Sequence, residues 1–190
     1  MQKPIATTRS ATGIPTGRLA VWWVLASEVV IFGGLLASYV MHRIGHPEWA
    51  DAAAVTNTWI GAFNTFVLLT SSFTAVLAHQ AAEHGDGKLA AKYLMFTIGG
   101  ALTFLIVKAF EWTSEISHGY TITANGFWSF YYTAAGLHAM HVIAGAVIMG
   151  FIARDAAKGR ELHRVELIGI YWHFVDVVWI FLFPLLYIAK

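Results

Sequence analysis

Seven ionisable side chains lie in stretches of this sequence that are otherwise aromatic or aliphatic. They are Glu28, Lys108, Glu111, His138, His141, His173 and Asp176. If such a stretch lies in a lipid bilayer, an ionisable group is costly there and predicts a function or a partner. Imidazole rings can ligate a metal or a haem iron, carboxylates can carry protons or ions, and both can hydrogen-bond one helix to another.

The spacing of these residues favours helix faces that point toward other helices. His138 and His141 are three residues apart, as are His173 and Asp176, and residues at this spacing lie on one side of a helix. At a rise of about 1.5 Å per residue, Glu28 lies at a depth similar to both pairs. We therefore expect three helices to meet through these groups. The sequence has no cysteine and no His-Glu-x-x-His motif, which excludes thiolate metal sites and zinc-protease chemistry.

Three interpretations stay open on spacing alone. His138 and His173 can ligate a haem b from facing helices, as in a quinone-linked protein. Glu28 and Asp176 can relay protons or ions, as in a free-standing transporter. The polar groups can also lock helices to each other or to partner subunits through hydrogen bonds.

A separate trio, Lys108, Glu111 and Glu115, occupies one helix face at intervals of three and four residues. We expect an ion pair near one end of its span. The aliphatic stem of a lysine can lie in lipid while its ammonium group reaches the interface. This trio therefore predicts a structural cluster at the membrane surface.

The composition places all of these residues in a membrane protein. Of 190 residues, 57% are hydrophobic and 12% are charged, and the mean hydropathy is +0.60. Soluble domains have about 25% charged residues. The net charge of +1 provides no basic surface for nucleic acid. A spanning helix needs roughly 20 apolar residues, and five segments qualify, at about 19–42, 58–80, 90–112, 127–152 and 166–189. We predict an all-α bundle of five transmembrane helices.

Basic residues fall mainly on one side of this bundle. Of the 12 Lys and Arg residues, nine lie in the N-terminal tail and in or beside the second and fourth connections: Lys3, Arg9, Arg18, Lys88, Lys92, Arg154, Lys158, Arg160 and Arg164. By the positive-inside rule, the N-terminus lies inside and the C-terminus outside. We predict a cytoplasmic tail over residues 1–18 and one transmembrane domain over residues 19–190.

Several sequence motifs together resemble one family. They are YWHFVDVVWIFLF at 171–183, YYTAAGLHAMHVIAG at 131–145, ASEVVIFGGLLASYV at 26–40, NTFVLLTSSFTAVLAHQA at 64–81 and FEW at 110–112. In this order they are similar to the motifs of haem-copper oxidase subunit III, the third core subunit of cytochrome c oxidase. The match runs from about residue 20 to the end of the sequence. The chain resembles the short bacterial form with five helices.

The resemblance implies a subunit without a redox centre, in which haem and copper belong to subunits I and II. Such a subunit packs against subunit I, stabilises it, supports proton uptake and binds structural phospholipids. The whole assembly reduces oxygen to water and translocates protons across the bacterial cytoplasmic (inner) membrane. Further partners implied are subunit II, a small subunit IV and a supercomplex with a quinol-oxidising complex.

The resemblance also implies roles for individual residues. Glu28 corresponds to a buried carboxylate near the proton-uptake side that reacts with carbodiimides in the family. Arg154 corresponds to an arginine that meets lipid head groups. A structural polar network is implied for His138, His141, His173, Asp176, Glu166 and Glu111. No catalytic, cofactor-binding or metal-binding residue is implied in this chain, and Lys108 is assigned no role.

Two points remain open within the resemblance. Longer members have two additional spans at the start, and these are missing here, so the lipid contacts of those spans do not carry over. The same short form also accompanies quinol oxidases and, in a related branch, nitric oxide reductases, so the electron donor is not determined.

Small residues are expected to form the face toward subunit I, namely Gly33, Gly34, Gly61, Ala62, Gly99 and Gly100.

Overall fold

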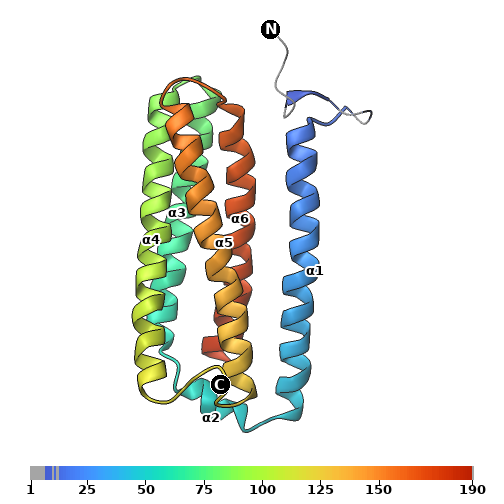
Figure 1. Ribbon diagram of the computed structural model, residues 1–190, viewed down its shortest axis with the longest axis vertical. Helices are drawn as coiled ribbons and strands as arrows, with labels where there is room; N and C mark the ends of the chain where they lie inside the picture. The colour runs from blue at the N-terminus through green and yellow to red at the C-terminus, as the bar shows by residue number, and fades with distance from the viewer. Residues whose placement is uncertain (1–6, 10, 12, 190) are drawn as a thin grey trace.

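The computed structural model describes residues 7–9, 11 and 13–189 (Figure 1). Its elements are α1 (Thr16–Gly45), α2 (Trp49–Ala54), α3 (Thr58–Glu83), α4 (Gly87–Ser117), α5 (Gly126–Ala156), α6 (His163–Phe183) and the π-helix η2 (Pro184–Ile188). Five helical stretches are long and apolar enough to cross a membrane, with η2 continuing α6. The predicted all-α class with five spans is confirmed. Of the predicted N-terminal tail, residues 1–6, 10 and 12 lie outside the described residues.

The long helices extend past the apolar segments that predicted them. For example, α4 ends at Ser117, whereas the apolar segment ends near residue 112. A helix continues through polar residues until a cap replaces its missing hydrogen bonds. At the N-termini of α3, α4 and α5, the side chains of Asn57, Asp86 and Asn125 accept backbone N–H groups in this way.

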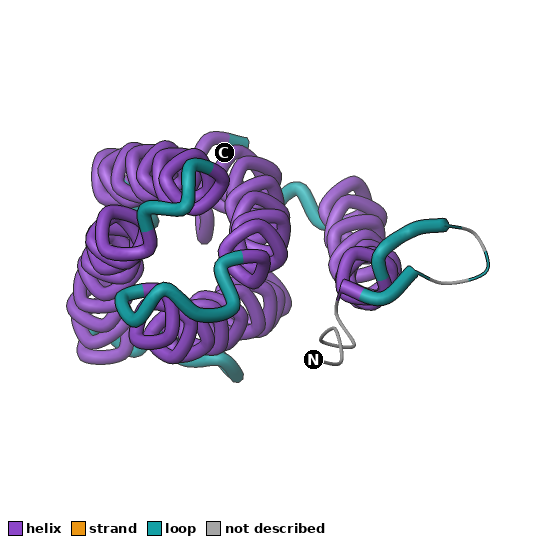
Figure 2. The backbone as a smooth tube through the Cα atoms, turned by 90° about the horizontal axis from the view of Figure 1, so that it is seen from above, coloured by secondary structure: helices purple, strands orange, loops and turns teal. Residues whose placement is uncertain are grey.

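Helices α3 to α6 form a bundle, and α1 stands to one side of it (Figures 1 and 2). Successive helices of the bundle run in opposite directions, which short turns permit. Helix α1 contacts the bundle through α5 and α6, and its buried residues are only Leu25, Phe32 and Tyr39. Most of α1 therefore presents apolar side chains to its surroundings.

The bundle has two distinct ends. At one end, the α3–α4 and α5–α6 turns lie near the start of α1, and we name it the turn end. At the opposite end lie α2, the α4–α5 loop and η2, and we name it the α2 end.

Glu48 lies outside the spans at the α2 end. Hydrogen bonds from its own backbone N–H and from His46 hold the pKa of its carboxyl group below the usual value.

Small residues let the helices of the bundle approach each other closely, as expected for helix packing in lipid. A Cβ atom at Gly100 would lie 2.6 Å from Cβ of Ser71, and one at Gly61 would lie 2.7 Å from Cε2 of Phe183. The expectation that these two glycines face subunit I is therefore wrong, because they are used within the chain. Nothing lies within 4 Å of a Cβ atom built at Gly33, Gly34 or Gly99.

Candidate functional site: buried polar groups between the helices

Glu28 of α1 meets His141 of α5 between the two helices. Oε2 of Glu28 lies 3.1 Å from Nε2 of His141, and both side chains are mostly buried. Nδ1 of His141 lies 2.8 Å from the carbonyl oxygen of Leu137 and must donate to it, because a carbonyl only accepts. Oε2 of Glu28 itself completes no hydrogen bond of acceptable geometry with the described residues. The contact between these two groups is therefore a polar meeting point of α1 and α5.

A second polar contact joins α1 to the bundle at the turn end. Arg18 forms an ion pair with Glu166 at the start of α6. Glu166, which the resemblance includes in a structural polar network, thus points toward α1, because the first turn of α6 lies beside the basic start of α1.

His138 does not share its surroundings with His141. Its ring is fully buried in the bundle, 5.4 Å from the ring of Phe104 and 5.1 Å from that of Trp179 between centroids. Neither ring nitrogen has a hydrogen-bond partner among the described residues. Residues three apart on a helix differ in direction by about 60°, which is enough here to send one histidine into the bundle and the other toward α1. The expectation of one shared histidine face is wrong.

His173 and Asp176 reach α3, whereas we expected α6 to meet α1 and α5 through them. Nδ1 of His173 lies 2.6 Å from Oγ of Ser72. Asp176 is 4% exposed, and its oxygens complete no hydrogen bond of acceptable geometry with the described residues, although Ser72 lies nearby. Among the predicted groups, only Glu28 and His141 join spans one and four, and α6 turns its polar side to the serines of α3.

Two tryptophans strengthen the contact between α6 and α3. The indole N–H of Trp172 donates to Oγ of Ser71 at 3.1 Å, and that of Trp179 donates to Oγ1 of Thr65 at 3.0 Å. A buried indole N–H needs an acceptor. These bonds were not predicted, although hydroxyl residues at 65, 71 and 72 on one helix are a signal for such contacts.

Lys108 lies inside the bundle near its α2 end. The residue is 1% exposed, and its Nζ donates to Oε2 of Glu111 at 2.8 Å, to Oη of Tyr131 at 3.0 Å and to Oη of Tyr187 at 2.6 Å. The expected ion pair with Glu111 is present, but the expected position at the membrane surface is wrong. The two tyrosine hydroxyls, from α5 and η2, supply the polar surroundings that the ammonium group would otherwise take from water.

Glu115 completes this cluster one turn further along α4. Its Oε1 accepts from the hydroxyl of Tyr131 at 3.0 Å. Together with Glu111 it lines a pocket of about 320 Å³ at the α2 end. Lys108, Glu111, Glu115, Tyr131 and Tyr187 are called the Lys108 cluster below. Sequence spacing identified its three residues on α4 but not the two tyrosines.

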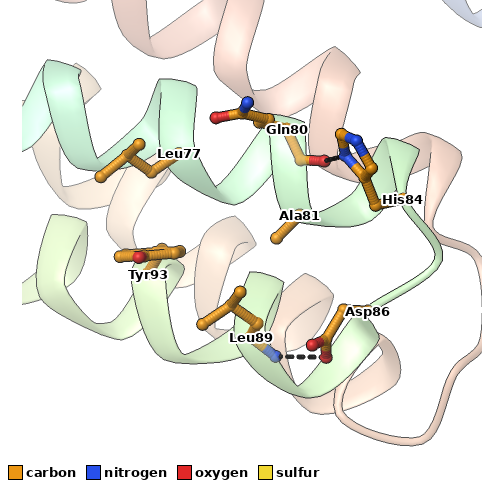
Figure 3. A pocket seen from close by; sticks show the side chains of 7 residues that line it. All are labelled: Leu77, Gln80, Ala81, His84, Asp86, Leu89 and Tyr93. Carbon is orange, nitrogen blue, oxygen red and sulfur yellow. Dashed lines mark hydrogen bonds between the residues drawn. The ribbon is translucent and has the colours of Figure 1, made fainter.

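Arg154 lies on α5 near the turn end. It is exposed and forms no ion pair with a described residue. A second hollow of about 320 Å³ lies at the α3–α4 turn (Figure 3). Two of its polar side chains make hydrogen bonds at the ends of their own helices. His84 bonds the carbonyl oxygen of Gln80, and Asp86 caps α4 by accepting the N–H of Leu89.

Within the described residues, no group of three or more His, Cys, Asp or Glu side chains is arranged to hold a metal ion. The imidazole nitrogens of His173 and His141 are directed to partners on neighbouring helices or on their own helix. Several polar side chains of the bundle thus contact neighbouring helices, whereas the side-chain polar atoms of Asn64, His138 and Asp176 complete no hydrogen bond with the described residues.

Comparison with known proteins identifies the family of this chain. The family model described as cytochrome c oxidase subunit III matches residues 7–190. A cytochrome c oxidase subunit 3 of Corynebacterium diphtheriae is 34% identical over 173 residues, covering 87% of this chain and 84% of the relative. One from Thermostichus vulcanus is 34% identical over 169 residues, covering 86% and 83%.

A third relative, named heme-copper oxidase subunit I+III, comes from Aeropyrum pernix. It is 31% identical over 183 residues, which cover 90% of this chain and 22% of that relative. The family match spans nearly the whole sequence, and five long apolar helices are what such a membrane subunit requires. The chain belongs to the cytochrome c oxidase subunit III family of haem-copper oxidases.

Proposed function

We propose that this chain is the subunit III of a bacterial respiratory oxidase that takes electrons from cytochrome c, and that it carries no redox centre itself. In this proposal the haem and copper centres, the reduction of oxygen and the proton translocation belong to the assembly with subunits I and II. The observation that carries the proposal is the use of the intramembrane polar side chains. Glu28, His141 and His173 contact other helices of the chain, as side chains that fix a scaffold do.

Subunit I is the proposed main partner, and the bundle is proposed to stabilise it. The Aeropyrum pernix relative supports this choice, because its name combines subunits I and III in one chain. Glycines at 33, 34 and 99 leave open space on α1 and α4, where another helix can approach. Subunit II, a small subunit IV and a supercomplex with a quinol-oxidising complex are proposed as further partners. The proposed location is the bacterial inner membrane, with the turn end toward the cytoplasm.

Structural phospholipid is proposed to fill the crevice between α1 and the bundle. One part of this crevice is a hollow of about 290 Å³ that Glu28, His141 and Tyr171 line together with apolar residues. Another part is a hollow of about 240 Å³ between α1 and α6, lined by apolar residues such as Phe32 and Phe174. Acyl chains suit this lining. Arg154, exposed near the turn end, is proposed to contact a head group.

Support for proton uptake is proposed to involve Glu28. Its Oε2 is buried without a hydrogen-bond donor among the described residues and lies beside Nε2 of His141, and carboxylates at membrane depth are typical of proton paths. This role is auxiliary, since the path to the oxygen-reducing site belongs to subunit I in the proposal. Asp176, Glu111, Glu166, His138 and His173 are proposed to stabilise the bundle.

The test is purification in mild detergent through an affinity tag on this chain, followed by absorption spectroscopy and mass spectrometry. We expect haem absorption bands together with subunits I and II. Stronger detergent should then detach this chain as a colourless protein and leave the haem with its partners. A His141→Leu variant serves as a comparison, and we expect it to retain haem in the partner fraction.

Three results would replace the proposal with a specific alternative. A homogeneous, stable chain that purifies without haem proteins would favour a transporter that uses Glu28 and Asp176. A Soret band in the detached chain that His138→Ala removes would favour haem ligation by His138 and His173. Oxygen consumption by the complex with a quinol but not with reduced cytochrome c would assign a quinol oxidase.

A further inference from the structure

The ammonium group of Lys108 has all of its hydrogen bonds within the Lys108 cluster. An ammonium group has three N–H donors, and three acceptors surround it at 2.6–3.0 Å, namely Glu111, Tyr131 and Tyr187. The aromatic rings of Trp112, Tyr131, Trp179 and Tyr187 lie 4.8–5.7 Å from Nζ and add favourable cation–π contacts. The hydrogen bonds and ring contacts therefore offset part of the cost of burying an ammonium group in the bundle.

The carboxylate oxygens of the cluster are not equally supplied with donors. Tyr187 and Tyr131 each have one hydroxyl proton, which can go to Oε2 of Glu111 and Oε1 of Glu115, both at 3.0 Å. The proton of Tyr132 favours the carbonyl oxygen of Tyr120 at 2.8 Å over Oε2 of Glu115 at 3.4 Å. Oε1 of Glu111 is buried and has no donor, and Oε2 of Glu115 has only the long contact with Tyr132. The carboxylate oxygens of the cluster are therefore short of donor protons.

The charge count gives the same result. Two carboxylates face one ammonium group, and Glu111 and Glu115 are 5% and 8% exposed. Two like charges close together in surroundings of low polarity do not both stay ionised without a further positive charge. The other titratable groups that face the pair, from α5, η2 and the α4–α5 loop, are tyrosines and one histidine: Tyr131, Tyr132, Tyr187, Tyr120 and His118. None of them supplies a permanent positive charge.

A route for the missing proton is present at the α2 end. The pocket of about 320 Å³ is lined by both carboxylate residues and by Asn57, Ser114, His118 and Tyr120, among others. No lysine or arginine lines it. The side chain of Glu111 is 3% exposed, yet it lines this pocket and has an oxygen without a partner. The pocket thus connects the surface with the buried oxygen of Glu111 that has no donor.

We propose that Glu111 and Glu115 together hold one exchangeable proton, which enters and leaves through this pocket at the α2 end. A hydronium ion in the pocket transfers its proton to a carboxylate oxygen, which forms an O–H bond and leaves a water molecule. The protonated carboxyl group then donates a hydrogen bond, and the excess negative charge of the cluster disappears. This proton-binding site goes beyond the proposed function and does not depend on the identity of the electron donor.

The test is infrared difference spectroscopy of the purified intact complex during pH steps in H2O and D2O. We expect a carboxylic-acid C=O band that grows as the pH falls and shifts in D2O. Glu115→Gln and Glu111→Gln should each remove this band, whereas Glu48→Gln, which changes an exposed carboxylate at the same end, should leave it. Lys108→Met should enlarge it, because the cluster then needs a second proton. A spectrum that is the same in wild type and both glutamine variants at every pH would overturn the proposal.

A second measurement uses the unaltered protein, so it does not depend on the folding of variants. A small water-soluble carbodiimide reacts with protonated carboxyl groups, and mass spectrometry locates the product. We expect modification at Glu111 or Glu115 that increases as the pH falls, with exposed Glu48 as the reference for reagent access. Modification of Glu48 without any at the pair would contradict the proposal. So would a metal ion bound in stoichiometric amount that Glu115→Gln releases.

Discussion

Nζ of Lys108 lies 2.6 Å from Oη of Tyr187, which joins α4 to the last turn of the described chain. Tyr187 belongs to η2, the π-helix that begins at Pro184, and the wider turn of this segment places its hydroxyl group inside the bundle. The same hydroxyl also contacts Tyr131 of α5 at 3.0 Å. Three elements therefore depend on one buried ammonium group.

Replacement of Lys108 by Met should destabilise the chain strongly. The change leaves Glu111 buried without its positive partner, and breaking a buried ion pair costs about 3–5 kcal/mol. Unfolding in detergent, followed by tryptophan fluorescence, measures the loss. The double variant Lys108→Met/Glu111→Leu should recover much of the stability, because it removes both charges. A double variant that is less stable than the single one would contradict this account.

Two adjacent glycines on α4 should respond differently to the same substitution. A methyl group at Gly100 collides with Ser71, and overpacking of this kind costs about 1–3 kcal/mol. A methyl group at Gly99 meets open space, so Gly99→Ala should leave the isolated chain unchanged or slightly more stable. Both variants are compared by thermal unfolding of the chain in the same detergent. Equal destabilisation by the two changes would show that the packing of Ser71 against Gly100 is not important.

The number and order of the spanning helices could be predicted from the sequence, because each long apolar run corresponds to one of them. The short elements α2 and η2 were not predicted. The ion pair between Lys108 and Glu111 could also be predicted, because its residues are three apart on one helix. Tyr131 and Tyr187 are 23 and 79 residues away from Lys108, and no local pattern identifies them. The burial of Lys108 follows from these distant contacts, so it could not be predicted from spacing.

The directions of the histidines were predicted less well for a related reason. A spacing of three residues places His138 and His141 on the same half of α5, but that half borders two different neighbours. Which neighbour each ring meets depends on where α1 and α6 pack. The sequence pattern indicates which residues are buried, whereas the packing of whole helices determines their partners.

Removal of the Ser71 hydroxyl should weaken the contact between α3 and α6. In Ser71→Ala the buried indole N–H of Trp172 loses its acceptor, while the Cβ atom that packs against Gly100 remains. Hydrogen bonds between helices in lipid contribute about 0.6 kcal/mol on average and up to about 1.7 kcal/mol. We expect a loss in this range in detergent unfolding. Ser27→Ala is the control, because the exposed hydroxyl of Ser27 bonds only the carbonyl oxygen of Val24 in its own helix.

Glu28 and His141 should determine how closely α1 stays beside the bundle. Only three residues of α1 are buried, and its attachment also uses this polar contact, the ion pair of Arg18 with Glu166 and the hydrogen bond that Tyr39 donates to the carbonyl oxygen of Leu185 at 3.0 Å. The sequence has no cysteine, which allows spin labels at introduced cysteines without background. Exposed positions 30 on α1 and 147 on α5 are suitable for labels.

Distances between these labels, measured by pulsed electron paramagnetic resonance on the chain in lipid nanodiscs, give the test. We expect Glu28→Leu and His141→Leu each to broaden the distance distribution and move it to longer values, because the polar contact between α1 and α5 is lost. Arg18→Ala combined with Glu28→Leu should increase the effect. Glu48→Gln changes an exposed carboxylate outside the spans and should leave the distribution unchanged. If the narrow wild-type distribution persists in Glu28→Leu, the contacts of Phe32 and Tyr39 are sufficient to hold α1, and the polar pair does not contribute to its attachment.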